Sequence, residues 1–424
     1  MKKLFLIFAI SLVFFSCNLF VKNSPDSEPP YKAKIAWDSG LVSNSHRSTI
    51  IDGDSVYFYE RPPEYNSVNV YTLTRLDAVT GALIWRSPTF TNIIFCPPVA
   101  LGSYIYVFID PNVICCFNKE NGELSAITQA NIENADSVMS WNVTGYGQYL
   151  YFGLRGISRC FVRLDVNDID HGDPETIQTI VPEILWQPET GKSVTAKPVV
   201  YDNTVYTGTY DPLLTGLIEL AGFNIDTKEM VFYKAFGGIE DVLAGNISNP
   251  DKGAYIDANP ILIHDDVLYY LGWSIAAWNL KTGKRLYRHV FTDDVPNAKR
   301  YYANGGIMQA VFYKGKIYYT NISSYTELGY RNIHCIDAAT GTLVWNDIAK
   351  DSASLITIPL IAHGRLYVCQ SVGLRVYEPE TGRLIGVDKS FEGADMDRNV
   401  LYGDYMICLR YNKGYTLVAV DVGK

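Results

Sequence analysis

Residues 333–345 read Ile-His-Cys-Ile-Asp-Ala-Ala-Thr-Gly-Thr-Leu-Val-Trp, and the pattern in this stretch recurs along the whole chain. An apolar run enters the sequence Asp-x-x-Thr-Gly at Asp337, and a second apolar run leaves it and ends at Trp345. The Asp carboxylate can accept hydrogen bonds from nearby backbone N–H groups and start a turn. Gly341 can take the left-handed conformation that finishes the turn. Two apolar runs joined in this way predict a β-hairpin.

The same turn occurs eight times, at intervals from 41 residues (Asp77 to Asn118) to 59 residues (Asp165 to Asn224). Its first residues are Asp77, Asn118, Asp165, Asn224, Asn279, Asp337, Glu378 and Asp421. The Trp position that follows the turn is occupied in successive copies by Trp85, Ala126, Trp186, Phe232, Tyr287, Trp345 and Gly386. In the third copy, about thirteen extra residues separate the turn from Trp186.

Two further markers precede the turn in most copies. One is a hydrophobe followed by Tyr, as in Val56-Tyr57, and the other is Pro followed by hydrophobes, as in Pro98-Val99. Each unit therefore predicts four strands, and a four-stranded repeat of this length is typical of a propeller blade. The pre-turn strands, such as Val113 to Phe117, are apolar on both faces, which fits a blade between two neighbours. We predict an all-β, eight-bladed β-propeller of four-stranded antiparallel blades.

The N-terminal strand is predicted to close the last blade. Residues 33–37 read Ala-Lys-Ile-Ala-Trp and resemble a fourth strand without the three before it, whereas the last repeat, residues 399–424, lacks its fourth strand. Pairing of Ile35 to Trp37 with Leu417 to Asp421 would close the ring and remove exposed sheet edges.

Composition narrows the classes of function. The chain has 424 residues, 19% of them charged, and a net charge of −9, so no basic surface predicts nucleic-acid binding. Of the eight Cys, several lie in apolar strand runs, and no Cys or His spacing is typical of a metal site. We therefore expect no bound metal.

The first residues predict export. Lys2 and Lys3 precede an apolar run, Leu4 to Phe15, that is too short to span a membrane, and Ser16 precedes Cys17. A small residue directly before Cys resembles the lipobox of bacterial lipoproteins, from whose commonest form Phe15 departs. We expect a signal peptide over residues 1–17, lipidation of Cys17, a flexible tether over 18–32 and the propeller over 33–424. The alternative is an ordinary cleaved signal peptide.

Long connections are the candidate binding loops, because loops on a rigid scaffold carry binding more often than its strands. They include an acidic insertion, residues 167–182, and the connections 237–257 and 291–306. Their candidate partner-binding residues are Asp170, Asp294, Arg300, Tyr301 and Tyr302. The alternative is that these loops only cover the ends of blades.

The combined pattern of Pro, Tyr and Asp-x-x-Thr-Gly-x-h-h-Trp (h for hydrophobic) resembles the pyrroloquinoline-quinone-type propeller repeat over roughly residues 33–424. The resemblance implies an eight-bladed propeller in which the Trp and the turn Gly dock neighbouring blades. The residues that would hold these structural roles are Trp37, Asp77, Gly81, Trp85, Trp186, Asp337, Gly341 and Trp345. Such a motif identifies a fold and not an activity.

Two branches of that family imply different functions. One contains quinone-dependent alcohol and sugar dehydrogenases, which need a quinone, a bound Ca²⁺ and a catalytic Asp. The other contains cofactor-free scaffolds, including the lipoprotein subunit of the outer-membrane β-barrel assembly machinery. Cys115-Cys116 is similar to the vicinal disulfide of some of those enzymes. The two Cys lie within an apolar strand run, where adjacent side chains point to opposite faces and do not pair.

The resemblance and the signal together favour a non-enzymatic, lipid-anchored, monomeric scaffold of the cell envelope that binds a protein partner. By resemblance, its role is in outer-membrane protein assembly, and we expect neither a cofactor nor a catalytic residue. Asn18 is not the Asp that retains many lipoproteins in the inner membrane, which favours the outer membrane. One alternative is a periplasmic dehydrogenase with pyrroloquinoline quinone and Ca²⁺. Another is a carbohydrate- or surface-ligand-binding lipoprotein, for which Tyr-rich loops would stack on sugars.

Overall fold

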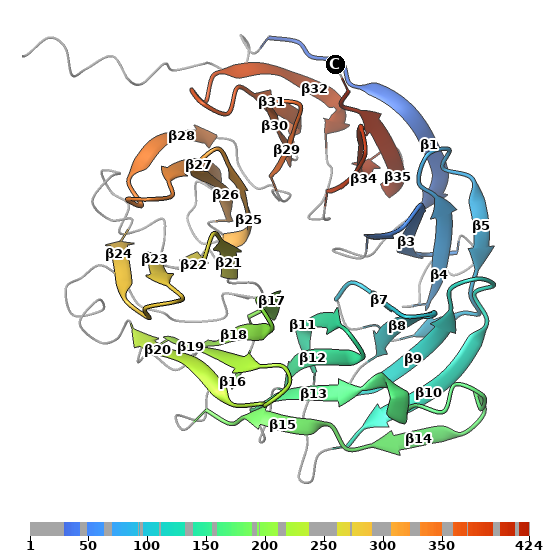
Figure 1. Cartoon of the computed structure of the whole chain (residues 1–424). Coiled ribbons are helices and arrows are strands. Elements are labelled where there is room, and N and C mark those ends of the chain that lie inside the picture. The colour runs from blue at the N-terminus through green and yellow to red at the C-terminus, as the bar shows by residue number, and fades with distance from the viewer. Residues whose placement is uncertain are drawn as a thin grey trace, which may run out of the picture.

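The computed structural model of the chain is a ring of eight antiparallel sheets, the blades of a β-propeller (Figure 1). The structure describes residues 29–42, 49–62, 70–91, 93, 96–109, 112–131, 139–154, 159–188, 193–194, 196–210, 218–236, 261–271, 274–290, 307–322, 331–349, 359–370, 372–392, 399–411 and 415–423. The predicted fold is confirmed. Within this part of the chain the structure has one short helical turn, η2 (Val166–Asp168).

The blades follow one another around the ring in chain order, and each runs from its innermost strand outward. Blade 1 has β2 (Ile50–Asp52), β3 (Ser55–Glu60), β4 (Val70–Asp77) and β5 (Leu83–Arg86), with β6 (Phe90–Thr91) beside β4. Blade 2 has β7 (Val99–Leu101), β8 (Tyr104–Ile109), β9 (Val113–Asn118), β10 (Leu124–Ala130) and an added outer strand, β14 (Ile177–Ile180). Blade 3 has β11 (Met139–Tyr146), β12 (Tyr149–Leu154), β13 (Phe161–Asp165) and β15 (Glu183–Trp186). Blade 4 has β17 (Val199–Tyr201), β18 (Thr204–Tyr210), β19 (Ile218–Asn224) and β20 (Met230–Phe236), with β16 (Ser193–Val194) beside β18.

The second half of the ring is more regular. Blade 5 has β21 (Ile261–His264), β22 (Val267–Leu271), β23 (Ser274–Asn279) and β24 (Arg285–Val290). Blade 6 has β25 (Ile307–Tyr313), β26 (Lys316–Ile322), β27 (Arg331–Asp337) and β28 (Leu343–Ala349). Blade 7 has β29 (Leu360–Ala362), β30 (Arg365–Gln370), β31 (Val372–Tyr377) and β32 (Leu384–Glu392). Blade 8 has β33 (Val400–Tyr402), β34 (Tyr405–Tyr411), β35 (Tyr415–Asp421) and, outermost, β1 (Lys34–Val42).

The outer strand of blade 8 comes from the other end of the chain. β1 pairs antiparallel with β35, with Ile35 opposite Val420 and Trp37 opposite Ala419. The same sheet therefore holds the first and the last described strands.

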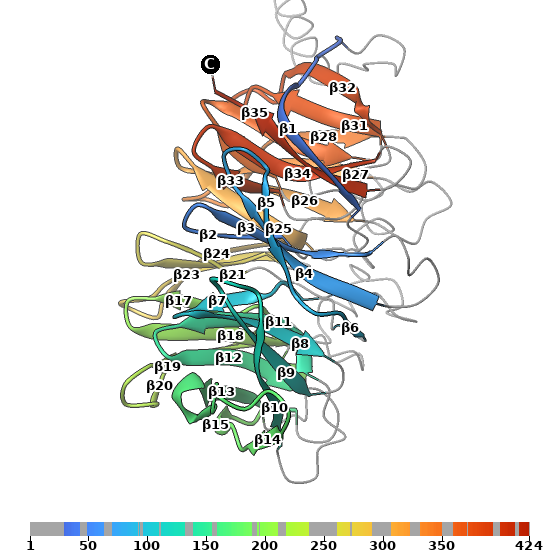
Figure 2. The same ribbon diagram turned by 90° about the vertical axis from the view of Figure 1, so that its right-hand side faces the viewer.

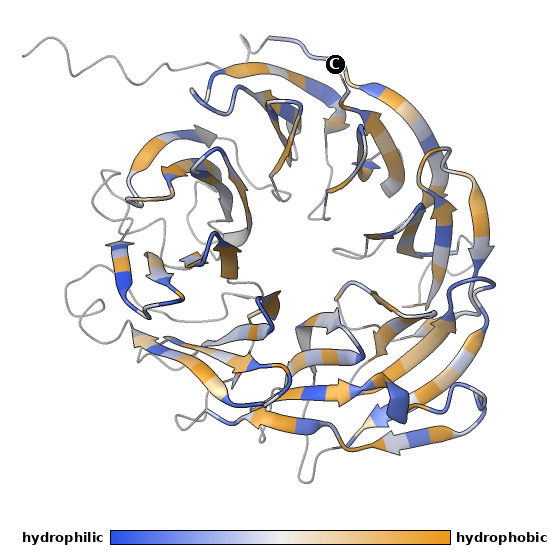
Figure 3. Ribbon diagram, in the orientation of Figure 1, coloured by the Kyte–Doolittle hydropathy of each residue, from blue (hydrophilic) through white to orange (hydrophobic). Residues whose placement is uncertain are grey.

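The hydrophobic core lies between the blades rather than at one centre. Middle strands such as β9 are buried on both faces, because each sheet packs against a neighbour on either side. Apolar residues accordingly recur along the strands of every blade (Figure 3). One cluster of buried side chains joins blades 1 and 2, and another joins blades 2 and 3.

In blades 1–7 the predicted turn lies between the third and fourth strands, whereas in blade 8 it follows β35 and the fourth strand is β1. Asp77 Oδ1 accepts hydrogen bonds from Thr80 N and Thr80 Oγ1, both at 2.7 Å, and these bonds lower the pKa of the carboxyl. Gly81 follows with φ +70° and donates its N–H to the Asp77 carbonyl at 2.9 Å. In blade 6, Asp337 Oδ1 accepts from Thr340 N at 2.9 Å, and Gly341 has φ +73°.

Antiparallel pairing divides the connections between two faces of the ring. Turns between first and second strands, and between third and fourth strands, lie on one face, as the β19–β20 and β23–β24 turns in Figure 2 illustrate. Connections from one blade to the next start from the opposite face. One of them joins β24 to β25 and holds Asp294, Arg300, Tyr301 and Tyr302. Those four residues and Cys17 lie outside the described residues.

Candidate interaction surface on the propeller rim

Three blade junctions are closed by a Trp that lies flat on a turn glycine. A Cβ built on that glycine would approach the indole ring to 2.5–2.6 Å, so only glycine fits beneath it. The indole Nε1 also donates to the carbonyl that follows the first residue of the same turn. The three locks are Trp37 on Gly81, Trp85 on Gly122 and Trp345 on Gly382.

At other junctions, a side chain other than Trp donates the hydrogen bond to the corresponding turn carbonyl. The Tyr287 hydroxyl donates to the Ala338 carbonyl at 2.8 Å, in the turn that holds Asp337 and Gly341. At the junction of blades 3 and 4, the Trp186 ring packs against Phe223, with ring centroids 6.2 Å apart. There, Arg163 Nη1 donates to the turn carbonyl of Ile225 at 2.7 Å. Of the predicted blade-docking residues, Trp37, Gly81, Trp85 and Trp345 therefore take part in Trp–glycine locks, while Asp77 and Asp337 organise turns.

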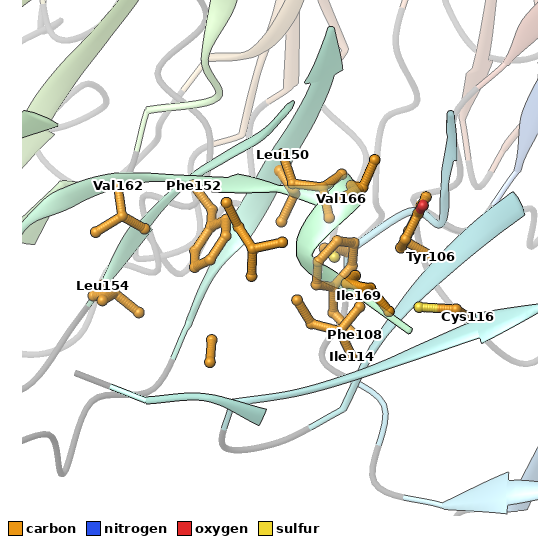
Figure 4. Close-up of a cluster of buried hydrophobic side chains, with 14 of the residues drawn as sticks. Tyr106, Phe108, Ile114, Cys116, Leu150, Phe152, Leu154, Val162, Val166 and Ile169 are labelled. Carbon is orange, nitrogen blue, oxygen red and sulfur yellow. The ribbon is translucent and has the colours of Figure 1, made fainter. Parts of the chain in front are cut away.

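At the junction of blades 2 and 3, the Trp position holds a small residue and the glycine position holds a large one. Ala126 occupies the Trp position of blade 2, and Ile169 occupies the glycine position of the following turn. Both are buried in one cluster with Phe108, Ile114 and Cys116 (Figure 4). The volume that a Trp supplies elsewhere comes here from the opposite side of the junction, which keeps the interior closely packed.

At the junction of blades 7 and 8, the chain's own N-terminal segment fills the Trp position. Gly386 stands there, and a Cβ on it would lie 2.7 Å from Tyr31 Cβ. Tyr31 N donates to the Val387 carbonyl at 3.0 Å, and Val387 N donates to the Pro29 carbonyl at 2.9 Å. We call residues 29–33 the N-terminal clasp. The part of the expected tether that the structure describes, residues 29–32, is therefore bound to blade 7.

The acidic insertion of blade 3 lies against the outer edge of blade 2. Its strand β14 pairs in parallel with β10, with Ile177 beside Ile127 and Ile180 beside Ala130. Asn131 N donates to the Ile180 carbonyl at 2.8 Å, which extends the pairing by one residue. β14 is the last strand of this sheet, so its other edge is the edge of the blade.

Side chains from blade 2 fix the start of the insertion. The His171 ring stacks on Tyr104 with ring centroids 3.8 Å apart, and its Nε2 lies 3.3 Å from the Tyr106 hydroxyl. Ser125 Oγ donates to the His171 carbonyl. Partial burial lowers the pKa of His171, so the ring is neutral at pH 7. These contacts hold the insertion as part of the scaffold.

Asp170 organises the insertion locally. Its Oδ1 accepts a hydrogen bond from Gly172 N at 2.9 Å, and its backbone N donates to Gln178 Oε1 at 2.8 Å. The side chain is exposed on the rim. It is thus the one candidate partner-binding residue that lies in the described part of the chain.

Acidic and apolar side chains share the outer surface of this insertion. Ile177 is 58% exposed, Val181 73% and Ile184, at the start of β15, 50%. Residues 167–182 contain four acidic residues and neither Lys nor Arg. We define the rim patch as Asp168, Asp170, Asp173, Glu175, Ile177, Val181 and Ile184. Exposed apolar side chains accompanied by acidic ones are typical of a protein-interaction site.

The acids of the insertion are visible in the sequence, but its strand was not predicted. The signal was present, because Ile177 to Val181 is rich in β-branched residues, which favour strands. The partner of that strand lies in the preceding blade, beyond the reach of any local pattern.

Metal ligands and a vicinal disulfide are features of the dehydrogenase alternative. No group of three or more His, Cys, Asp or Glu side chains among the described residues could hold a metal ion. Cys115 and Cys116 are buried free thiols in two different clusters, on opposite faces of β9. Burial raises the pKa of Cys115 to about 11, so its thiol is protonated at pH 7. No helix in the described ranges has the length and apolar character to cross a membrane.

Comparison with known proteins agrees with this architecture. A family model described as outer membrane protein assembly factor BamB matches residues 272–390, and the matched blades lie in a ring of eight. The matched part of the chain resembles the PQQ-like repeat family, and the fold of the protein is an eight-bladed β-propeller. No curated protein sequence matches it.

Solved structures of two functional kinds share the fold of this propeller. BamB from Moraxella catarrhalis superposes with a TM-score of 0.59 at 12% identity, covering 92% of this chain and 98% of that chain. A europium-containing methanol dehydrogenase gives 0.63 at 12% identity, covering 93% of this chain and 88% of that chain. Quinohemoprotein alcohol dehydrogenase from Comamonas testosteroni gives 0.62 at 12% identity, covering 92% and 77%. At these identities the likeness establishes the fold alone.

Proposed function

We propose that the protein is an exported, lipid-anchored scaffold without catalytic activity that binds another protein of the cell envelope, in outer-membrane protein assembly. The family match to an assembly factor and the likeness to BamB over nearly the whole of both chains support this proposal. The signal-like residues 1–17 and the lipobox-like Cys17 support the anchor.

The observation that carries the proposal is the rim patch. All its residues except Ile184 lie on an insertion whose position is fixed by β14 pairing and by the His171 contacts, so little ordering entropy is lost when a partner binds. Its exposed apolar side chains supply contact area, and its acids favour a partner with a basic surface.

The N-terminal clasp and the rim patch lie on opposite sides of the ring. The N-terminal clasp holds the chain at β32 and β1, whereas β14 and β15 lie across the ring from these strands (Figures 1 and 2). Residues 18–28 would connect a lipidated Cys17 to the clasp over at most about 40 Å. An anchor at Cys17 would therefore tether the protein at the clasp side of the rim and leave the rim patch on the side away from the tether.

A quinone-dependent dehydrogenase is the second candidate, because two dehydrogenase structures superpose with TM-scores of 0.62 and 0.63. That function requires pyrroloquinoline quinone and Ca²⁺ bound near the axis of the ring. The two candidates differ in a direct test of the purified protein.

We would cross-link the lipidated protein in its own membrane and identify the proteins attached to it. In a second experiment, the soluble propeller would be assayed for binding of quinone and Ca²⁺ and for dye-linked oxidation of alcohols and sugars. The proposal predicts recovery of an outer-membrane β-barrel assembly protein and no quinone binding. Stoichiometric quinone with substrate oxidation would refute it in favour of the dehydrogenase. Binding of an oligosaccharide with neither of these results would favour a surface-ligand-binding lipoprotein.

A further inference from the structure

We propose that the open edge of β14 is the partner-binding element, and that it takes an extended, basic and apolar segment of the partner as an additional strand of blade 2. The inference rests on the proposed scaffold function and specifies its partner chemistry. Strand addition of this kind takes its affinity from main-chain hydrogen bonds and its specificity from alternate side chains.

The hydrogen bonds of β14 show which of its backbone groups face outward. The Gln178 carbonyl accepts from Thr128 Oγ1 at 3.3 Å, and the Ile180 carbonyl accepts from Asn131 N, so both carbonyls point toward β10. In a parallel ladder the backbone groups of alternate residues point to opposite sides. The N–H and carbonyl groups of Ile177 and Thr179 therefore face the open edge.

The rim of this propeller already accepts extended segments. β14 itself is an addition to β10, and Pro30 in the N-terminal clasp forms a parallel bridge with Val387 of β32. Both additions run parallel to the outer strand and lie beside a position where the docking aromatic is absent, at Ala126 and Gly386. The insertion continues this surface outward by one strand and ends in an unpaired edge.

The side chains beside the edge define what can bind. Ile177 and Val181 are the more exposed apolar residues of the patch, at 58% and 73%. Asp168 and Glu175 are exposed and precede β14 in the insertion, which holds neither Lys nor Arg to offset them. The complementary segment has apolar side chains at alternate positions and Lys or Arg at the end that lies beside these acids.

A second copy of this chain is the wrong occupant for this edge. Two β14 edges would bring two sets of four acidic side chains together, and like charges at a strand edge prevent such pairing. β14 is also only four residues long, so its backbone alone provides few hydrogen bonds. The edge therefore selects a basic partner segment and disfavours self-association.

The test uses the full soluble propeller and a defined probe, the peptide acetyl-Lys-Val-Thr-Val-Thr-Val-Lys-amide. Affinity is measured by fluorescence anisotropy with a labelled peptide, and backbone amide exchange is followed by NMR. We expect binding that weakens with added salt and slower exchange of the Ile177 and Thr179 amides. The exchange of Gln178 and Ile180, whose groups already face β10, is expected to stay unchanged. A peptide with Glu in place of Lys should bind at least tenfold more weakly.

Two substitutions separate the edge from the surrounding surface. Thr179→Pro removes the outward N–H and should weaken peptide binding at least tenfold, whereas the matched Thr179→Val variant keeps the N–H and should bind normally. Ile177→Lys adds a positive charge and removes apolar contact, and should also weaken binding at least tenfold. Because it leaves the backbone unchanged, this variant serves if Thr179→Pro detaches β14.

The outcomes distinguish this inference from the proposed function. Equal peptide affinity in wild type, Thr179→Pro and Ile177→Lys, or no binding by wild type, overturns the edge. If wild type and Ile177→Lys recover the same assembly protein from membranes equally well, the scaffold function stands and the edge is refuted. Quinone-dependent oxidation by wild type would refute the scaffold function itself.

Discussion

Replacing Gly81 by Ala tests how the Trp locks hold the ring. The new Cβ would lie 2.6 Å from the Trp37 indole, so the ring must move from its position on the turn. Overpacking of this kind costs about 1–3 kcal/mol. The left-handed backbone of Gly81, with φ +70°, adds about 1–2 kcal/mol for any residue with a Cβ. The single variant should lose about 2–5 kcal/mol of unfolding free energy.

The two contributions can be separated by removing the indole. Trp37→Ala deletes a side chain that is 8% exposed together with its hydrogen bond to Ala78, and should cost about 3–5 kcal/mol. In that background Gly81→Ala meets no ring, so only the backbone strain remains. The double variant should therefore be about 1–3 kcal/mol more stable than the sum of the single changes predicts.

Urea unfolding followed by far-UV circular dichroism measures all four proteins, provided that the slopes of their transitions agree. A matched control is Gly53→Ala, whose φ is +55° and whose Cβ would meet nothing within 4 Å. It should cost the strain alone, in either Trp37 background. Additivity of Trp37→Ala and Gly81→Ala within about 0.5 kcal/mol would refute the lock.

Three further changes test other junctions and the buried His334. Tyr287→Phe removes the hydrogen bond to Ala338 and should cost about 1 kcal/mol, whereas Tyr146→Phe, at a side chain 46% exposed, should cost almost nothing. Deleting residues 29–33 from the soluble domain removes three hydrogen bonds to blade 7 and should cost about 2–4 kcal/mol. His334 is 1% exposed, and burial lowers its pKa to about 3. Below about pH 6.5 the imidazole binds a proton in the unfolded state but not in the folded state, so the free energy of unfolding falls as pH falls. The loss from this group should be about 2 kcal/mol between pH 7.5 and pH 5, and His334→Phe should abolish it.

Unfolding titrations provide the measurements, and each has a clear contrary result. Equal losses of stability in the two Tyr→Phe variants would show that the Tyr287 hydrogen bond does not stabilise the junction. Unchanged stability after deletion of the N-terminal clasp would mean that another group fills the space at Gly386. For His334, the decisive quantity is the difference in pH dependence between wild type and the Phe variant, because other groups titrate equally in both. If the two proteins show the same pH dependence, the His334 imidazole is solvated rather than buried.

The sequence predicted the ring because each blade carries its own local signals. Asp77 and Gly81 define a turn by their own chemistry, and strands with two apolar faces need a neighbour on either side. The periodic recurrence of these signals is enough to predict a propeller, whatever the identity of any single residue.

The repeat pattern could not explain its own exceptions, because each of them depends on a residue from a distant part of the chain. Ala126 and Gly386 read as degenerate copies, yet each position is completed by a distant segment. Ile169 comes from the next blade, and Tyr31 comes from a stretch predicted to be a tether. The rim patch was half predicted for the same reason: its acids are visible in the sequence, but the pairing of β14 with β10 depends on which blades become neighbours.

The pairing of β1 with β35 constrains how the protein reaches its final state. Lys34 and Asp421, which are joined by a side-chain hydrogen bond, are 387 residues apart in the chain. Bringing such distant ends together costs roughly 5 kcal/mol of chain entropy. The first strand to leave the ribosome or a membrane translocon thus waits for the last one, while seven blades form between them. Until then β1 is an unpaired strand edge, open to aggregation, and so a chaperone that shields it during export would raise the yield of folded protein more than one acting on any middle blade.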